Sequence, residues 1–83
     1  AKFPNAKPIQ SPVKGKVIWQ YDVADVSTAP NIGTEFKQDK PVCYVEAYFG
    51  PMEVPAPING RIVAITAKQG DNVEKGEILG FIE

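Results

Sequence analysis

The sequence predicts an all-β domain of about eight short strands arranged as two quasi-symmetric halves. Apolar runs are short and are broken by glycine, proline and aspartate, and no window has the i, i+3, i+4, i+7 spacing of an amphipathic helix. The second observation is an internal repeat. Because a unit of about four strands is too small to bury its apolar face alone, we expect the two halves to pack together as a flattened barrel or sandwich.

The repeat aligns residues 9–46 with residues 54–83. Each half begins with an extended segment that ends at a proline, turns at a glycine and continues as a hydrophobic strand. A further turn and strand complete it. The matched positions are Pro12 with Pro57, Gly15 with Gly60, Gly33 with Gly70, and Glu46 with Glu83.

The first half is longer than the second in the region DVADVSTAPNI, residues 22–32. Pro30, Asn31 and Gly33 in and beside it are turn formers, so the extra residues are expected to form a surface loop between the second and third strands. At the other end of this half, residues 1–8 (AKFPNAKP) have the composition of a linker or disordered end. The predicted domain therefore spans residues 9–83. Since the chain begins without methionine and ends within a strand-like run, we expect it to be a piece of something longer.

Composition and charge limit the classes of partner that we expect for this chain. The 83 residues carry a net charge of -1, with 43% hydrophobic and 23% charged residues, which is ordinary for one globular domain. Without a basic run, nucleic acid and anionic membranes are not expected partners. Without an apolar span or leader, the expected location is the cytoplasm.

Few residues could support chemistry. There is no histidine, and the one cysteine, Cys43, lies in an apolar run without a metal-ligand partner, so neither a catalytic residue nor a metal site is predicted. Glutamates at strand ends and lysines at turns are interpreted as solvated charges, and four aromatic residues at strand positions as packing residues. The charged set is Glu46, Glu53, Glu83, Lys68, Lys75 and Glu77, and the aromatic set is Trp19, Tyr21, Tyr44 and Phe81.

Residues 47–53 (AYFGPME) connect the two halves and are expected to form a hairpin tip. Its aromatic and apolar composition is typical of a surface that contacts something, although folding back over the end of the barrel is the alternative. The candidate contact residues are Tyr48, Phe49, Gly50, Pro51 and Met52.

Residues 45–60 (VEAYFGPMEVPAPING) resemble the attachment region of the biotinyl/lipoyl domain family, which in biotin-bearing members reads roughly EAMKM, followed by an apolar-Pro-Ala-Pro segment and glycine. Residues 60–83 are similar to the family's strand, Gly-Asp turn, Val-x-Lys-Gly turn and final strand. The resemblance implies a barrel-sandwich hybrid. The longer first half also resembles the thumb of some biotin carriers.

In the ungapped alignment, the family's modified lysine falls on Phe49, and Tyr48 and Gly50 replace the flanking methionines. No lysine occurs between Lys40 and Lys68, so the resemblance implies a domain without biotin or lipoate and without another cofactor. The first half also departs from the family by having Thr34 and Asp39 in its turns, which leaves their geometry open.

The resemblance implies a non-catalytic domain of a larger biotin-dependent enzyme. Similar domains end the carboxyltransferase subunit of pyruvate carboxylases and the α subunit of oxaloacetate decarboxylases. Docking or assembly with other domains or subunits would then be its role, without a small-molecule substrate of its own. The alternatives are a genuine biotin carboxyl carrier and the lipoyl-like domain of a membrane-fusion or efflux protein. A related sugar-phosphotransfer component would need a histidine, which the chain lacks.

Overall fold

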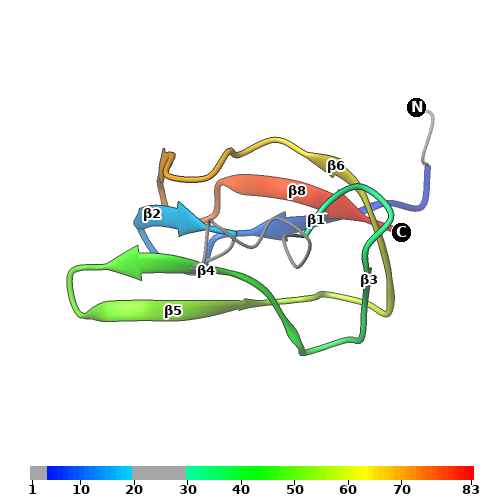
Figure 1. Cartoon of the computed structure of the whole chain (residues 1–83), viewed down its shortest axis with the longest axis horizontal. Helices are drawn as coiled ribbons and strands as arrows, with labels where there is room; N and C mark the ends of the chain where they lie inside the picture. The colour runs from blue at the N-terminus through cyan, green and yellow to red at the C-terminus, as the bar shows by residue number, and fades with distance from the viewer. Residues whose placement is uncertain (1–3, 20–29) are drawn as a thin grey trace.

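The computed structural model describes residues 4–19 and 30–83 (Figure 1). These residues form eight strands and no helix. The first strand starts two residues before Ile9, where the sequence predicts the domain to begin, so Lys7 and Pro8 belong to the sheet and not to a linker. The strands are β1 (Lys7–Gln10), β2 (Gly15–Ile18), β3 (Glu35–Phe36), β4 (Pro41–Ala47), β5 (Gly50–Pro55), β6 (Gly60–Ile65), β7 (Asn72–Val73) and β8 (Ile78–Ile82).

The strands form two antiparallel sheets, in the orders β1-β8-β6-β3 and β5-β4-β2-β7. Replacing each strand by its counterpart four places along the chain converts one order into the other. This confirms the two quasi-symmetric halves. Each sheet takes two strands from each half, so the halves are interleaved and neither could form its sheet alone.

The hydrogen bonds that join the halves repeat with the same symmetry. The N–H of Gly33 donates to the carbonyl of Ile62 at 2.7 Å, and the N–H of Gly70 donates to the carbonyl of Val17 at 2.8 Å. Each half therefore supplies the acceptor for a turn of the other. Both glycines have a positive φ, 92° for Gly33 and 86° for Gly70, which is the physical reason for glycine at the matched positions.

The turns of the first half keep the geometry of the second despite their different residues. Thr34 Oγ1 accepts a bond from the N–H of Asn31 at 3.0 Å, as Asp71 Oδ2 does from the N–H of Lys68 at 2.8 Å. A hydroxyl and a carboxylate both accept such a local bond. The turn geometry that the sequence left open is thus the same in both halves.

The core lies between the sheets and consists mainly of aliphatic side chains that alternate inward along the strands. Trp19 is buried, and its indole Nε1–H donates to the carbonyl of Ala67 at 2.8 Å, which satisfies its polar atom. Tyr44 and Phe81 are half-buried, as expected of packing residues, whereas Tyr21 lies outside the described residues. The most completely buried side chains are Ile9, Val17, Cys43, Val45, Val54, Ile62, Val73, Leu79 and Ile82.

The tip of the β4–β5 hairpin and the end of β8 lie at opposite ends of the molecule (Figure 1). Because Lys7 pairs with Ile82 in the antiparallel β1–β8 ladder, the start of β1 and the end of β8 are neighbours. The hairpin tip projects away from them. The predicted insertion falls largely on residues 20–29, which lie outside the described residues.

Candidate functional site

The candidate site is built on the β4–β5 hairpin, whose strands pair from Pro41 with Pro55 to Ala47 with Gly50. Only Tyr48 and Phe49 remain as turn residues, and neither has a positive φ, which excludes the type I′ and II′ turns. Gly50 has a φ of 121° and completes the reversal in a conformation that side chains rarely adopt. This confirms the predicted hairpin tip.

The aromatic rings of the tip are exposed. Tyr48 is 101% exposed and Phe49 is 54% exposed, with ring centroids 5.2 Å apart at an interplanar angle of 87°. Such an edge-to-face pair stabilises the relative orientation of the two rings. The ring of Tyr48 is therefore open to solvent, whereas that of Phe49 is partly covered. Pro51 and Met52 beside it are also exposed.

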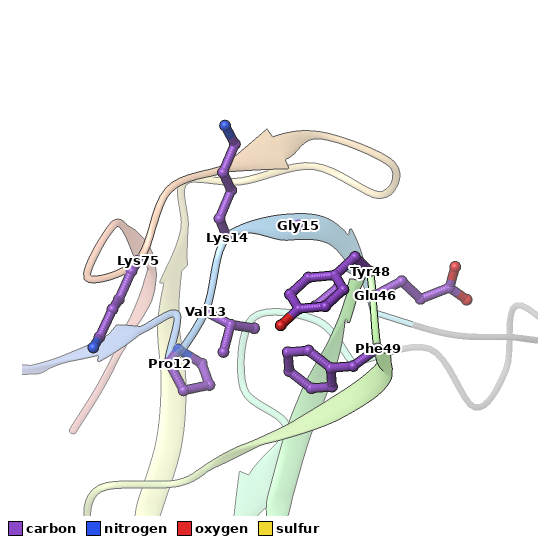
Figure 2. Close-up of a pocket in the computed structure, with 9 residues that line it drawn as sticks. Pro12, Val13, Lys14, Gly15, Glu46, Tyr48, Phe49 and Lys75 are labelled. Atoms are coloured by element: carbon purple, nitrogen blue, oxygen red, sulfur yellow. The ribbon is translucent and has the colours of Figure 1, made fainter.

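An open pocket with a volume of about 580 Å³ adjoins the tip. Figure 2 shows the rings of Tyr48 and Phe49 extending toward Val13, from the segment between β1 and β2. Lys75, from the turn before β8, lies on the far side of the pocket. The pocket is lined by Pro12, Val13, Lys14, Gly15, Glu46, Ala47, Tyr48, Phe49 and Lys75.

The charges around the pocket are unevenly placed. The carboxylate of Glu46 points away from the rings in Figure 2, and Glu46 lies opposite Lys16 in the β2–β4 ladder. Lys14 Nζ is 3.9 Å from Glu74 Oε2, with both side chains mostly exposed, so that pair contributes little. Within the described parts of the chain, Lys75 forms no ion pair. In Figure 2 the amines of Lys14 and Lys75 extend away from the rings, so the walls nearest the rings are the apolar side chains of Pro12 and Val13.

The edge of the hairpin is a poor template for another strand. β5 is the outer strand of its sheet. Pro51 and Pro55 carry no N–H, which removes two backbone donors from a six-residue edge. A partner at this end would therefore be held by side chains more than by strand addition.

Other candidate chemistry is limited in the described part of the chain. No group of three or more acidic, cysteine or histidine residues lies close enough to hold a metal ion in residues 4–19 and 30–83. Burial raises the pKa of the Cys43 thiol to about 12, so it remains protonated near neutral pH. The charged residues at strand ends and turns (Glu46, Glu53, Glu83, Lys68, Lys75 and Glu77) are all exposed.

The described residues include no helix long and apolar enough to cross a membrane.

The structure adds residues to the site that the sequence did not single out. Pro12, Val13 and Lys14 lie far from the tip in the chain, and the β2–β4 ladder brings their segment beside it. The repeat did not mark them. Lys14 aligns with Asn59 and Lys75 with Gln38, but in the same turns Glu74 and Glu77 align with Lys37 and Lys40, so the charges differ in both directions.

Comparisons with known proteins agree with this fold. Residues 7–82 match the family described as biotin-requiring enzyme. The chain is 35% identical over 63 residues to the dihydrolipoyllysine-residue succinyltransferase component of the 2-oxoglutarate dehydrogenase complex of Bartonella vinsonii subsp. berkhoffii, covering 68% of this chain and 15% of the relative. It is 38% identical over 61 residues to a pyruvate carboxylase subunit of Methanocaldococcus jannaschii, covering 71% of this chain and 10% of the relative.

The structure also superimposes on a crystal structure of the Kluyveromyces lactis urea carboxylase with a TM-score of 0.75 and 25% identity. That match covers 95% of this chain and 6% of the carboxylase. The chain therefore spans a small part of the length of each of these three proteins. With a family match over nearly all of its residues and the same two-sheet architecture, the chain belongs to the biotin-requiring enzyme family of biotinyl/lipoyl domains.

Proposed function

We propose that the chain is a non-catalytic biotinyl/lipoyl-like domain of a larger biotin-dependent carboxylase or decarboxylase, that it is not itself modified, and that it acts in docking or assembly. One observation carries the proposal. The residue that aligns with the family's modified lysine is Phe49, and it sits in the two-residue turn of an exposed hairpin.

The residues at this tip do not fit a biotinyl or lipoyl group. Attachment of either group forms an amide with a lysine ε-amine. The turn consists of Tyr48 and Phe49, neither of which has an amine in its side chain, and no lysine occurs between Lys40 and Lys68. We therefore assign no carrier step to the tip.

The relatives support a place within a larger enzyme. Two of the matched proteins are a pyruvate carboxylase subunit and a urea carboxylase, and the chain covers only 10% and 6% of their lengths. A domain of this size beside much longer chains fits partners within the same polypeptide or complex.

The arrangement of the ends supports docking through the tip. Lys7 at the start of β1 pairs with Ile82 at the end of β8, at one end of the molecule. The tip projects from the opposite end and is free to contact a different surface. Exposed aromatic and apolar side chains grouped in this way commonly mark contact sites.

The state of modification is tested by intact mass spectrometry and streptavidin blotting of the protein isolated from its natural source. We expect the mass of the unmodified chain and no streptavidin signal, with a biotin carrier from the same cells as the positive control. A mass increment of biotin or lipoate on any lysine would contradict the proposal and favour a genuine carrier.

Docking is tested with the double substitution Tyr48→Ser/Phe49→Ser in the full-length protein, by measuring subunit association by analytical ultracentrifugation. We expect association to weaken while the fold is retained. Ile32→Ser is the matched control, because Ile32 is 58% exposed in the turn before β3, away from the tip. Unchanged assembly in the double variant would refute docking through the tip.

A further inference from the structure

The two halves of the chain are paired with each other more extensively than either is paired within itself. Residues 4–19 and 30–83 form six ladders, and four of them join a strand of the first half to a strand of the second: β1 to β8, β2 to β7, β3 to β6, and β4 to β5. The other two, β2–β4 and β6–β8, lie within a half. An isolated half would leave most of its strand edges unpaired, so each half needs a complementary one.

The core is shared between the halves in the same way. Ile9, Val17 and Val45 of the first half lie in one hydrophobic cluster with Ile62 and Leu79 of the second. Neither half can bury these side chains without the other. A complementary half from a second copy of the chain would supply the same ladders and the same core contacts as the half in the same chain.

The source of the complementary half is decided by the turn at Tyr48 and Phe49, which connects β4 to β5. This two-residue turn contains no glycine, asparagine or aspartate and is neither type I′ nor type II′, the types that hairpins of this length favour. The reversal depends on Gly50, whose φ is 121°, and a Cβ at Gly50 would have no atom within 4 Å. The closed hairpin therefore relies on one glycine conformation against which nothing packs.

The apolar side chains at this connection contribute little to the core of the closed chain. Tyr48, Phe49 and Met52 are among the exposed large hydrophobic residues, and Pro51 is exposed beside them. In Figure 1 they belong to the end of the hairpin that projects farthest from the end of β8. Opening the turn would thus sacrifice few core contacts, and the exposed side chains remain available for contact with another chain.

From these observations we propose that two copies of the chain form a dimer by exchanging halves, with residues 48–50 as the hinge. Strands β5–β8 of one copy complete the sheets of β1–β4 of the other, so each barrel keeps its six ladders and its core, and only the turn opens. Short hinge loops favour such exchange. The two hinge segments cross, which brings the rings of Tyr48 and Phe49 from both copies together. The proposal rests on the assembly role above and names a second copy of the chain as the partner.

The first experiment refolds the full chain from denaturant at high and at low protein concentration and measures the dimer by size-exclusion chromatography with light scattering. We expect the concentrated sample to contain a dimer that persists after dilution, because its separation requires both barrels to unfold. A monomer at every concentration would overturn the proposal. So would a dimer that dissociates at once on dilution, as two closed copies in contact would do.

The hinge is tested with Gly50→Val. Valine is strongly disfavoured at the positive φ of the closed turn and favoured in an extended hinge. Because each dimer opens two hinges, we expect its dissociation constant, measured after equilibration in mild denaturant, to fall about tenfold or more.

Gly70→Val is the matched control for Gly50→Val. Gly70 has a φ of 86° and also has no atom within 4 Å of an added Cβ, but its turn lies within the second half and is unchanged by exchange. It should destabilise monomer and dimer alike and leave the dissociation constant unchanged. An equal effect of the two substitutions on that constant, or none from Gly50→Val, would refute the hinge. In the opposite direction, Tyr48→Asn/Phe49→Gly supplies the favoured type I′ sequence and should keep the chain monomeric.

A disulfide distinguishes exchanged halves from closed copies in contact. Glu46 and Pro51 lie opposite each other in the β4–β5 ladder, and Glu46→Cys/Pro51→Cys is oxidised only after refolding, when Cys43 is buried. In an exchanged dimer the disulfide joins two chains, so we expect a covalent dimer on a non-reducing denaturing gel. Disulfides only within single chains, in a fraction that is dimeric before denaturation, would overturn the proposal.

The outcomes separate this proposal from docking through the tip. If Tyr48→Ser/Phe49→Ser weakens association of the full-length protein and no disulfide joins two chains, docking stands and the exchange of halves is refuted. If the disulfide joins two chains and Tyr48→Ser/Phe49→Ser leaves association with other subunits unchanged, docking to those subunits fails and the exchange stands.

Discussion

Asp39 and Gly76 occupy the same left-handed backbone conformation at equivalent positions of the two halves, with φ of 71° and 86°. The N–H of Asp39 donates to the carbonyl of Ala56 at 3.0 Å, and that of Gly76 donates to the carbonyl of Ser11 at 2.7 Å. Aspartate is one of the few residues other than glycine that enters this region at moderate cost. The interleaved sheets thus determine the backbone conformation of this turn. The residue that occupies it can be aspartate or glycine.

A matched pair of substitutions at Gly76 tests this relationship. We expect Gly76→Asp to lower the free energy of unfolding by about 1 kcal/mol or less, because Asp39 shows that the backbone accepts this side chain. Gly76→Val should cost about 2 kcal/mol or more, since a β-branched residue is strongly disfavoured at positive φ. Urea denaturation followed by tryptophan fluorescence measures both. Equal losses for the two variants would contradict the explanation.

Gly15 and Gly60 are required for a different reason, which is close approach of another strand. A Cβ at Gly60 would lie 2.5 Å from the carbonyl oxygen of Glu83, and one at Gly15 would meet the carbonyl of Glu46 in the same way. The clashing atoms are backbone and cannot rotate aside. We therefore expect either Gly→Ala substitution to lower the free energy of unfolding by about 2 kcal/mol or more.

The control for these two variants is Gly33→Ala, where an added Cβ would have no atom within 4 Å but φ is 92°. It isolates the cost of the backbone conformation, about 1 kcal/mol. Thermal unfolding by circular dichroism measures all three. A smaller loss for Gly60→Ala than for Gly33→Ala would show that the strand contact is not tight.

Much of the fold could be predicted because the same constraints act twice. Gly15 with Gly60 and Gly33 with Gly70 recur in the sequence, since close approach and positive φ each demand glycine. The exchange of strands between the halves could not be predicted, because a repeat gives the elements without stating which half supplies the neighbour of each strand. Position 39 is a second example of what the repeat could not predict. Asp39 differs from its counterpart Gly76 in residue type, although the two have the same backbone conformation.

The candidate site was predicted only in part. The tip is contiguous in the chain, so Tyr48 and Phe49 stand out as an apolar turn between two strands. The pocket joins the tip to Val13 and Lys75, which are distant in sequence and become neighbours only through strand register. As isolated residues, the lysines resemble ordinary surface charges.

Cys43 gives a pH-dependent prediction. Burial raises the pKa of its thiol from 9.0 to about 12, so the unfolded chain loses this proton at lower pH than the folded chain does. The contribution of Cys43 to stability is therefore complete below pH 9 and is lost between about pH 9 and pH 12. Over that window the free energy of unfolding should fall as the pH rises, because the unfolded chain binds fewer protons at this group than the folded chain does.

Lysines and tyrosines also titrate in this range, so the measurement is the difference between the wild type and Cys43→Ala. The variant should be less stable at pH 7, because it leaves a small cavity, and the gap should narrow as pH rises. A gap that is independent of pH would contradict the assignment. In the folded protein at pH 8, Cys43 should also react with a thiol reagent far more slowly than it does in denaturant.

The final prediction concerns the stability of the tip end. Lys14→Asn places an acceptor where Asn59 binds the N–H of Gln38 in the other half, and removes only a long, exposed pair with Glu74. We expect the free energy of unfolding to rise by about 0.5 kcal/mol. The reciprocal Asn59→Lys should lower it by a similar amount, and chemical denaturation measures both.

A rise in stability would show that the turn does not need the lysine, because asparagine supplies an acceptor that the lysine side chain lacks. If Lys14→Asn destabilises the protein, the turn at the tip end differs from its counterpart, and the lysine has a structural role there. The sign of this one change in stability therefore shows whether Lys14 has a structural role in the turn.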